Sequence, residues 1–134
     1  MSGPTIWLRP SPPTWMMALV DDLWMVDFGD PHPGEPASFR PAIEVGPSPI
    51  FSFWSIPENE FPFVFAVPLT TAVRGLPFHV EVEPTLQTGL VDVSYAQCEL
   101  MRSISRRRLV HRLGAISAEE SRQISAVLKA LLGH

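Results

Sequence analysis

Proline most strongly limits the fold of this 134-residue chain, because all 15 of its prolines lie at or before Pro84. Proline interrupts the interior of a helix and removes a hydrogen bond from a central strand. The chain up to Pro84 is therefore expected to form short extended segments and turns, with any long helix after it. With 46% hydrophobic residues the chain can build a core, and its length is that of one domain.

Residues 1–16 contain four prolines and two tryptophans without a regular period. We expect an irregular leader there and a single domain over residues 17–134. The single cysteine, Cys98, cannot close an internal disulfide, which fits a reducing, cytoplasmic location. No segment approaches the roughly 18 apolar residues that span a bilayer, so a membrane role is not expected.

Apolar segments between turn residues predict strands at residues 23–28, 41–45, 61–69, 78–83 and 89–101, with an edge piece at 51–54. Within 61–69, Pro62 and Pro68 are expected to confine the strand to the stretch between them. Residues 78–83 alternate with period two, which indicates one buried and one wet face.

The end of the chain predicts one amphipathic helix. Ser117 and Glu120 have the spacing of a capping box. Apolar residues then follow with helical spacing up to Gly133, at Ile124, Val127, Leu128, Leu131 and Leu132. A shorter helical turn is expected at residues 105–109, with Ser105 as its cap. The fold class is therefore mainly β, a compact and strongly bent antiparallel sheet closed by a C-terminal helix.

Charge is distributed unevenly along the chain, whose formal net charge is −4. The window 100–114 holds five arginines and no acid, so the remaining five basic and 14 acidic residues leave −9 elsewhere. This window is either a solvated, arginine-rich turn or a surface for a polyanion or an acidic partner.

Several segments, in order, resemble the PemK/MazF family of toxins. They run from Asp22 to Gly133 and include DLWMVDF at 22–28, GE at 34–35, RPA at 40–42, VPLTT at 67–71, RGLPFHV at 74–80 and QCELMRSI at 97–104. No single motif is specific, but their common order is. The resemblance implies an SH3-like small barrel of the PemK/MazF/CcdB type that forms a homodimer. It further implies a toxin that inhibits growth as a sequence-specific mRNA interferase, which is a metal-independent endoribonuclease that needs no cofactor. The resemblance also implies that a MazE-like antitoxin neutralises this toxin.

Metal-free cleavage of single-stranded RNA has the ribose 2′-OH attack its own phosphate and leaves 2′,3′-cyclic phosphate and 5′-OH ends. It needs a proton acceptor, a donor for the leaving oxygen and positive charge for the phosphorane. Arg40 matches the family's arginine, and its planar fork suits two phosphate oxygens. The non-catalytic alternative is a surface arginine paired with Glu35 or Glu44. Thr70 matches the family's hydroxyl residue, or else caps the turn before Arg74.

The general base is less well defined by the sequence. Glu35 is the candidate, although an ordinary loop carboxylate is a weak base unless its surroundings raise its pKa. His32 could substitute for it. Some branches of the family have a histidine before this glutamate and an arginine two residues before the later acid, where this chain has Gly34 and Gln97. Those departures favour an orienting or base-recognising role for Glu99.

Other residues are expected to bind the substrate. Besides Glu99, the candidates are Phe39, which can stack on a base, and Thr71, Arg74 and Arg102. The histidines and Cys98 have no paired ligand spacing, so no metal site is predicted.

Two other functions remain open. The first is a toxin of the same fold that binds DNA gyrase, as CcdB-like proteins do, although those typically end in Trp-Gly-Ile and this chain ends Leu132-Gly133-His134. The second is a decayed member that binds only its antitoxin.

Overall fold

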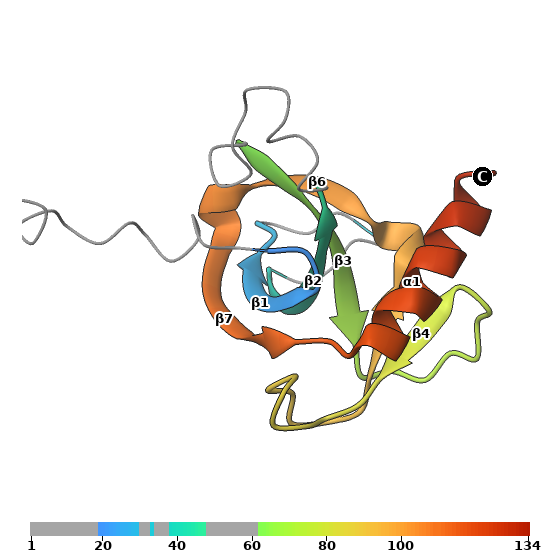
Figure 1. The fold of residues 1–134 in the computed structure, drawn as a ribbon. Helices are drawn as coiled ribbons and strands as arrows, with labels where there is room; N and C mark the ends of the chain where they lie inside the picture. The colour runs from blue at the N-terminus through green and yellow to red at the C-terminus, as the bar shows by residue number, and fades with distance from the viewer. Residues whose placement is uncertain (1–18, 30–32, 34–37, 48–61) are drawn as a thin grey trace, which may run out of the picture.

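The computed structural model describes residues 19–29, 33, 38–47 and 62–134, which form a bent antiparallel sheet of seven strands and one α-helix (Figure 1). The strands are β1 (Asp22–Asp27), β2 (Phe39–Gly46), β3 (Phe63–Thr70), β4 (His79–Val82), β5 (Ser94–Gln97), β6 (Arg102–Ser105) and β7 (Leu109–Ala115). Two 3-10 turns, η5 (Cys98–Leu100) and η6 (Arg106–Arg108), flank β6, and α1 spans Ala118–Leu131. The strand order is β4-β5-β3-β2-β1-β7, with β6 paired to β3. The predicted mainly β fold with a C-terminal helix is confirmed, and its open, curved sheet is compatible with a small barrel.

Most predicted elements are present, with adjusted ends. β4 alternates between buried and more accessible residues as expected, and η6 follows Ser105, whose hydroxyl accepts a hydrogen bond from the Arg107 amide at 3.3 Å. The strand predicted from residue 89 begins only at Ser94. The leader 1–16 and the edge piece 51–54 lie outside the described residues.

The expectation that Pro68 ends its strand is wrong. Pro68 lies within β3 and faces Ala42 of β2. On its other side β3 changes partner, because residues 63–66 pair with β6 and residues 69–70 pair with β5. Pro68 falls between those two ladders, where no registered partner on that side requires an amide hydrogen.

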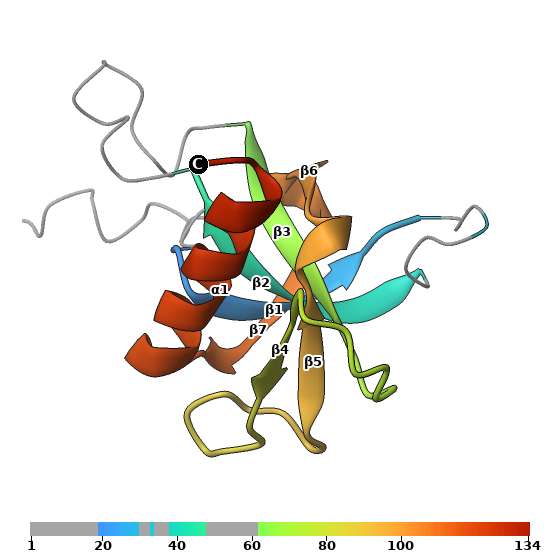
Figure 2. The ribbon, with the colours of Figure 1, turned by 90° about the vertical axis from the view of Figure 1, so that its right-hand side faces the viewer.

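Two hydrophobic clusters lie on opposite faces of the sheet, because successive strand residues project to opposite sides. The first cluster contains Leu23, Ile43 and Val67 and is covered by α1 through Ile124. The second contains Trp24 and Ala42 and is closed by residues of β6 and β7 where the sheet bends. Figure 2 shows α1 lying across one face, with β4 and β5 side by side. The opposite face of β2, β3, β4 and β5 is therefore not covered by the helix.

The capping box at the start of α1 is confirmed. The Ser117 hydroxyl accepts from the Glu120 amide at 3.1 Å, and the Glu120 carboxylate accepts from the Ser117 amide at 2.9 Å. Ile124 is buried, whereas Leu131 and Leu132 at the far end are largely exposed. The helix is therefore anchored mainly through its middle, where Val127 and Leu128 also pack against the core.

Two glycines let the β4–β5 loop approach β7 closely. A Cβ on Gly89, which has a φ of +71°, would lie 2.1 Å from the Leu113 carbonyl oxygen. One on Gly114 would lie 2.1 Å from the Gln87 carbonyl oxygen. That Gln87 carbonyl also accepts from the Ala115 amide at 2.9 Å. The loop thus accepts a backbone hydrogen bond from the outer edge of β7.

Candidate active site

Strand register places the main site candidates on one face. Ala42 of β2 faces Pro68 of β3, and two residues farther along, Arg40 and Thr70 lie at the same end of this strand pair. Thr70 in turn faces Tyr95 of β5. Because side chains alternate between faces, Arg40 and Thr70 project to the side away from α1. The structure thus brings together these two residues, 30 positions apart in the sequence.

Arg40 is held by an amide from another strand. Its Nη1 donates to Oε1 of Gln97, the last residue of β5, at 3.2 Å. Gln97 is buried and Arg40 is half-buried. Among the described residues the partner of this guanidinium is thus Gln97 and not Glu44, and Glu35 lies outside the described residues. Its remaining N–H groups provide the donors that two phosphate oxygens need.

A second polar pair lies beside Gln97. His79 of β4 faces Gln97 of β5 in the sheet register. Its Nε2 lies 3.0 Å from Oε2 of Glu99, which η5 turns back toward the strand. The His79 side chain is 3% exposed and that of Glu99 is 29% exposed. The Glu99 carboxylate is therefore partly exposed, whereas the imidazole that it contacts is buried.

The Thr70 hydroxyl caps the turn before Arg74, which the sequence predicts as the alternative to a phosphate contact. Its Oγ1 accepts from the Ala72 amide at 3.1 Å. A hydroxyl that accepts here keeps its own proton available as a donor. Thr71 and Arg74 follow in the exposed loop after β3.

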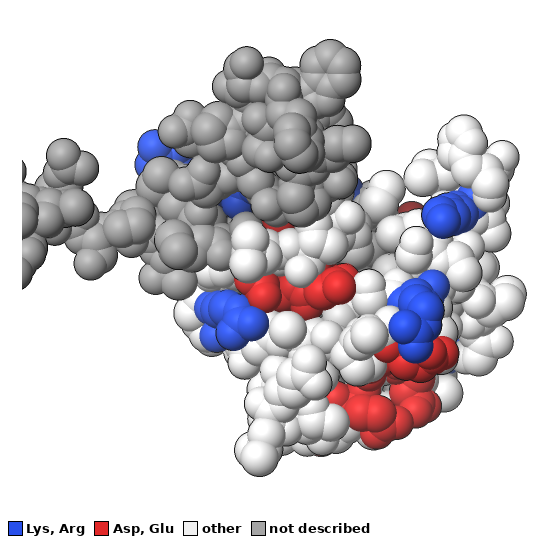
Figure 3. Space-filling view, in the orientation of Figure 1, with Lys and Arg blue, Asp and Glu red and all other residues white. Residues whose placement is uncertain are grey.

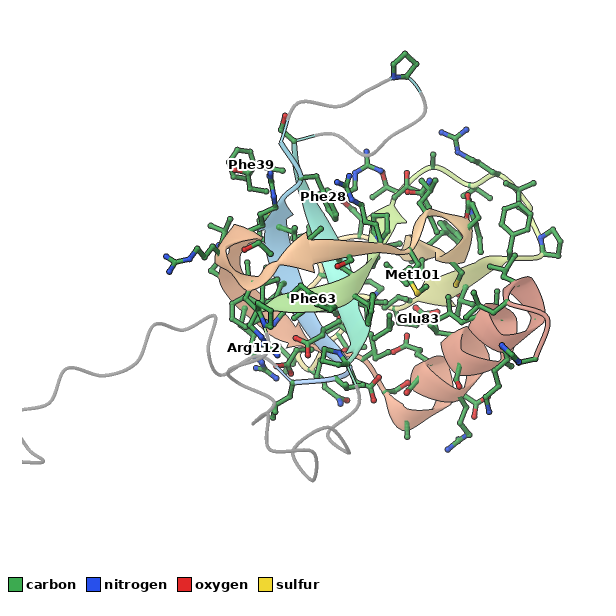
Figure 4. The ribbon with its side chains drawn as sticks, turned by 90° about the horizontal axis from the view of Figure 1, so that it is seen from above. Phe28, Phe39, Phe63, Glu83, Met101 and Arg112 are labelled. Atoms are coloured by element: carbon green, nitrogen blue, oxygen red, sulfur yellow. The ribbon has the colours of Figure 1, made fainter. Side chains whose placement is uncertain are left out.

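The remaining predicted site residues are dispersed. Glu35 and His32 lie outside the described residues. Phe39 is 63% exposed and, as the neighbour of Arg40 on β2, projects to the other face. Figure 4 places Phe39 at the outer end of the β1–β2 pair, with Glu83 beside α1. Arg102 lies over the Phe28 ring, with its guanidinium carbon 5.6 Å from the centroid.

The arginine-rich window 100–114 is not a continuous solvated surface. Arg106 is 1% exposed, Arg108 donates to the Asp27 carbonyl at 3.2 Å and Arg112 pairs with the buried Asp22 at 3.0 Å. On the face shown in Figure 3, basic side chains form separate patches with acidic ones between them. Several of these arginines therefore hold the sheet together.

Cys98 lies in the core beneath the site and is 2% exposed. Burial, and next the nearby Glu99 charge, raise the pKa of its thiol to about 11. The thiol is therefore protonated at neutral pH and is a poor nucleophile.

The sequence missed two members of this arrangement. Both residues belong to segments that resemble the family, but the sequence gives Gln97 no role beyond a departure from the family pattern and His79 none beyond a place in an alternating strand. The signal that could have found them was a hairpin pairing of residues 79–82 with 94–97, because that register places His79 opposite Gln97. Among the described residues, no group of three or more His, Cys, Asp or Glu side chains is arranged to hold a metal ion.

Comparison with known proteins now identifies the family. The sequence model described as "PemK-like, MazF-like toxin of type II toxin-antitoxin system" matches residues 20–132. The chain belongs to this family. It is also 30% identical over 113 residues to the Endoribonuclease toxin MazF of Escherichia coli (strain K12), covering 84% of this chain and 91% of that protein.

Solved structures of MazF proteins share the fold. MazF from Deinococcus radiodurans superimposes with a TM-score of 0.67 at 23% identity, over 86% of this chain and 96% of that one. A mycobacterial endoribonuclease in complex with its cognate antitoxin gives a TM-score of 0.66 at 21% identity, over 87% and 95% of the two chains. In the described part of this PemK/MazF-family chain, no helix is long and apolar enough to cross a membrane.

Proposed function

We propose that this chain is the toxin of a type II toxin–antitoxin pair and acts as a sequence-specific endoribonuclease on single-stranded mRNA without a metal ion. Its family and its 30% identity to an endoribonuclease toxin support this proposal. The observation that carries it is the position of Arg40, a half-buried guanidinium fixed at one nitrogen by Gln97 at the end of the strands.

The proposed chemistry is attack of a ribose 2′-OH on the adjacent phosphate. Arg40 stabilises the charge of the phosphorane, and the Thr70 hydroxyl donates to one of its oxygens. Glu35 accepts the proton of the 2′-OH. The bond from phosphorus to the 5′-oxygen breaks, and this oxygen takes a proton from solvent, which leaves a 2′,3′-cyclic phosphate and a 5′-OH.

A fixed arginine suits this reaction better than a mobile one. A donor already oriented toward developing charge needs no reorganisation during the reaction. Loss of one such donor typically lowers kcat about 100- to 1,000-fold. Arg40→Ala should reach this range, because it removes the whole charged fork.

The test is cleavage of a mixed-sequence single-stranded RNA in EDTA by the wild-type protein and by Arg40→Ala. Arg122→Ala is the matched control, since it removes an exposed arginine of α1 that pairs with the exposed Glu119. Wild type and control should cut, and the products should accept phosphate from polynucleotide kinase directly because their 5′ ends are hydroxyls. Cleavage that is abolished by EDTA, or retained by Arg40→Ala, would contradict the proposal.

The proposed partners are a second copy of the chain, a MazE-like antitoxin and single-stranded RNA. A solved relative of the same fold is described as a complex with its cognate antitoxin, which supports the second of these. Light scattering should give twice the monomer mass of 14.9 kDa. A gyrase inhibition assay separates the CcdB-like alternative, because inhibition of gyrase without any RNA cleavage would replace the present proposal.

A further inference from the structure

His79 has one partnered and one unpartnered ring nitrogen. Nε2 meets Glu99 at 3.0 Å, whereas Nδ1 is buried and has no hydrogen-bond partner among the described residues. The ring also packs edge-to-face on Phe78, with centroids 5.5 Å apart. The imidazole is therefore fixed in place with one polar atom unused.

The Glu99 contact determines which nitrogen of a neutral ring carries the proton. A carboxylate oxygen only accepts, so Nε2 must be the donor in this pair. Nδ1 of the neutral ring is then a bare acceptor. A buried acceptor without a donor is uncommon in folded proteins and calls for an explanation.

Gln97 carries the complementary group. Its Oε1 accepts from Arg40, which leaves the N–H groups of its side-chain amide as donors. Gln97 and His79 are registered neighbours on β5 and β4, and both project to the face away from α1. A donor group and an unpartnered acceptor thus belong to neighbouring residues on adjacent strands.

We propose that His79 is a positioning residue for Arg40 and acts through Gln97. In the substrate complex, Gln97 donates from Nε2 to Nδ1 of His79, which completes a chain of donors from Arg40 through Gln97 and His79 to Glu99. Every link has the same polarity, because Nε2 of His79 is the donor to Glu99. The chain fixes the Gln97 amide with its oxygen toward Arg40, since a flipped amide would direct N–H groups at the guanidinium.

This role deepens the proposed nuclease function and rests on it. His79 touches no reacting atom, so its effect should appear in kcat with little change in KM. Without the chain, Arg40 keeps its charge but loses its fixed orientation. Loss of a hydrogen bond to a charged group is strong enough to lower kcat roughly tenfold.

Two replacements of His79 separate positioning from packing. His79→Asn places an acceptor oxygen near the position of Nδ1, whereas His79→Leu fills the site with an apolar group. We expect the asparagine variant to keep kcat within about threefold of wild type and the leucine variant to lose about tenfold. A role in packing alone gives the opposite order, because leucine suits a buried site better than asparagine does. Thermal melts of both variants give their stabilities, and His79→Met is the second apolar replacement if His79→Leu does not fold.

A double-mutant cycle tests the route through Gln97. Gln97→Met removes the middle link, so adding His79→Leu to it should change kcat by less than about twofold. Effects that multiply, or an asparagine variant no more active than the leucine variant, would overturn the proposal.

The outcome is readable even if the chain cuts no RNA, a result that would refute the proposed function instead. Nitrogen-15 NMR of the protein with a bound 2′-deoxy oligonucleotide, which has no attacking hydroxyl, then reports the Arg40 guanidinium and the His79 tautomer directly. His79 should carry its proton on Nε2 when neutral, and His79→Leu should shift the Arg40 resonances while His79→Asn leaves them near their original positions. Arg40 resonances unaffected by His79→Leu, or a proton on Nδ1, would overturn the positioning role independently of activity.

Discussion

Replacing Gln97 by glutamate should weaken the action of Arg40 on the phosphate although Arg40 itself is unchanged. The substitution keeps the shape of the side chain but puts a carboxylate at the position of an amide oxygen 3.2 Å from the guanidinium. Two unit charges at that separation attract by about 5 kcal/mol at an effective dielectric constant of 20. The introduced charge would therefore compete directly with a phosphate for Arg40.

The expected loss follows from that energy. If only half of it opposes the transition state, kcat falls about 100-fold, which corresponds to about 2.7 kcal/mol. Gln97→Met, which removes the hydrogen bond without adding charge, should lose only about tenfold. Single-turnover cleavage of one fluorescent single-stranded RNA in EDTA measures both rates under identical conditions.

Ala126→Glu is the matched charge control, because it adds the same charge on an exposed position of α1. Its cleavage rate should stay close to that of wild type, which separates a local effect from a change in net charge. If Gln97→Glu cleaves as fast as Gln97→Met, the amide does not hold the arginine that the reaction uses, and the site described above is misassigned.

Three further predictions concern the fold. Gly89→Ala should lower the free energy of unfolding by about 3 kcal/mol or more, because its Cβ would meet backbone at 2.1 Å. Gly75→Ala, also at positive φ but with nothing within 4 Å, should lower it by only about 1–2 kcal/mol. Denaturant titration of the two variants compares these losses, and equal losses would contradict the close approach. Ser117→Ala should lower the free energy of unfolding by about 1 kcal/mol through loss of the capping box, and an unchanged melting temperature would show that the cap is dispensable. Cys98 should react slowly with iodoacetamide at pH 8, since its raised pKa keeps the thiol protonated below about pH 11, and the rate should rise once urea unfolds the chain; fast alkylation of the native protein, seen by mass spectrometry, would refute its burial.

Local patterns in the sequence predicted local structure well. The capping box at Ser117 and the alternation in β4 depend on residues within one element, so short-range rules were sufficient. Pro68 shows where such rules fail, because its place inside β3 depends on a change of partner strand that only the tertiary fold determines. Likewise, the arginine count of residues 100–114 gave no sign that Arg106 would be buried.

The candidate site was predictable only in part. Arg40 and Thr70 came from the family resemblance, and the register places them at the same strand ends. Their surroundings required knowledge of which strands pair, because Gln97 and His79 are 57 and 39 positions from Arg40 in the sequence. Phe39 shows the converse, since a residue adjacent to Arg40 in sequence projects to the other face of the strand.

The order in which the site's strands leave the ribosome has a consequence for the cell that makes this protein. Arg40 emerges early, yet its partner Gln97 comes more than 50 residues later, and β1 must wait for β7 at residues 109–115. Pairings between distant segments form late in folding, after the intervening chain is available. A nascent chain therefore lacks a finished site until almost all of it has been translated.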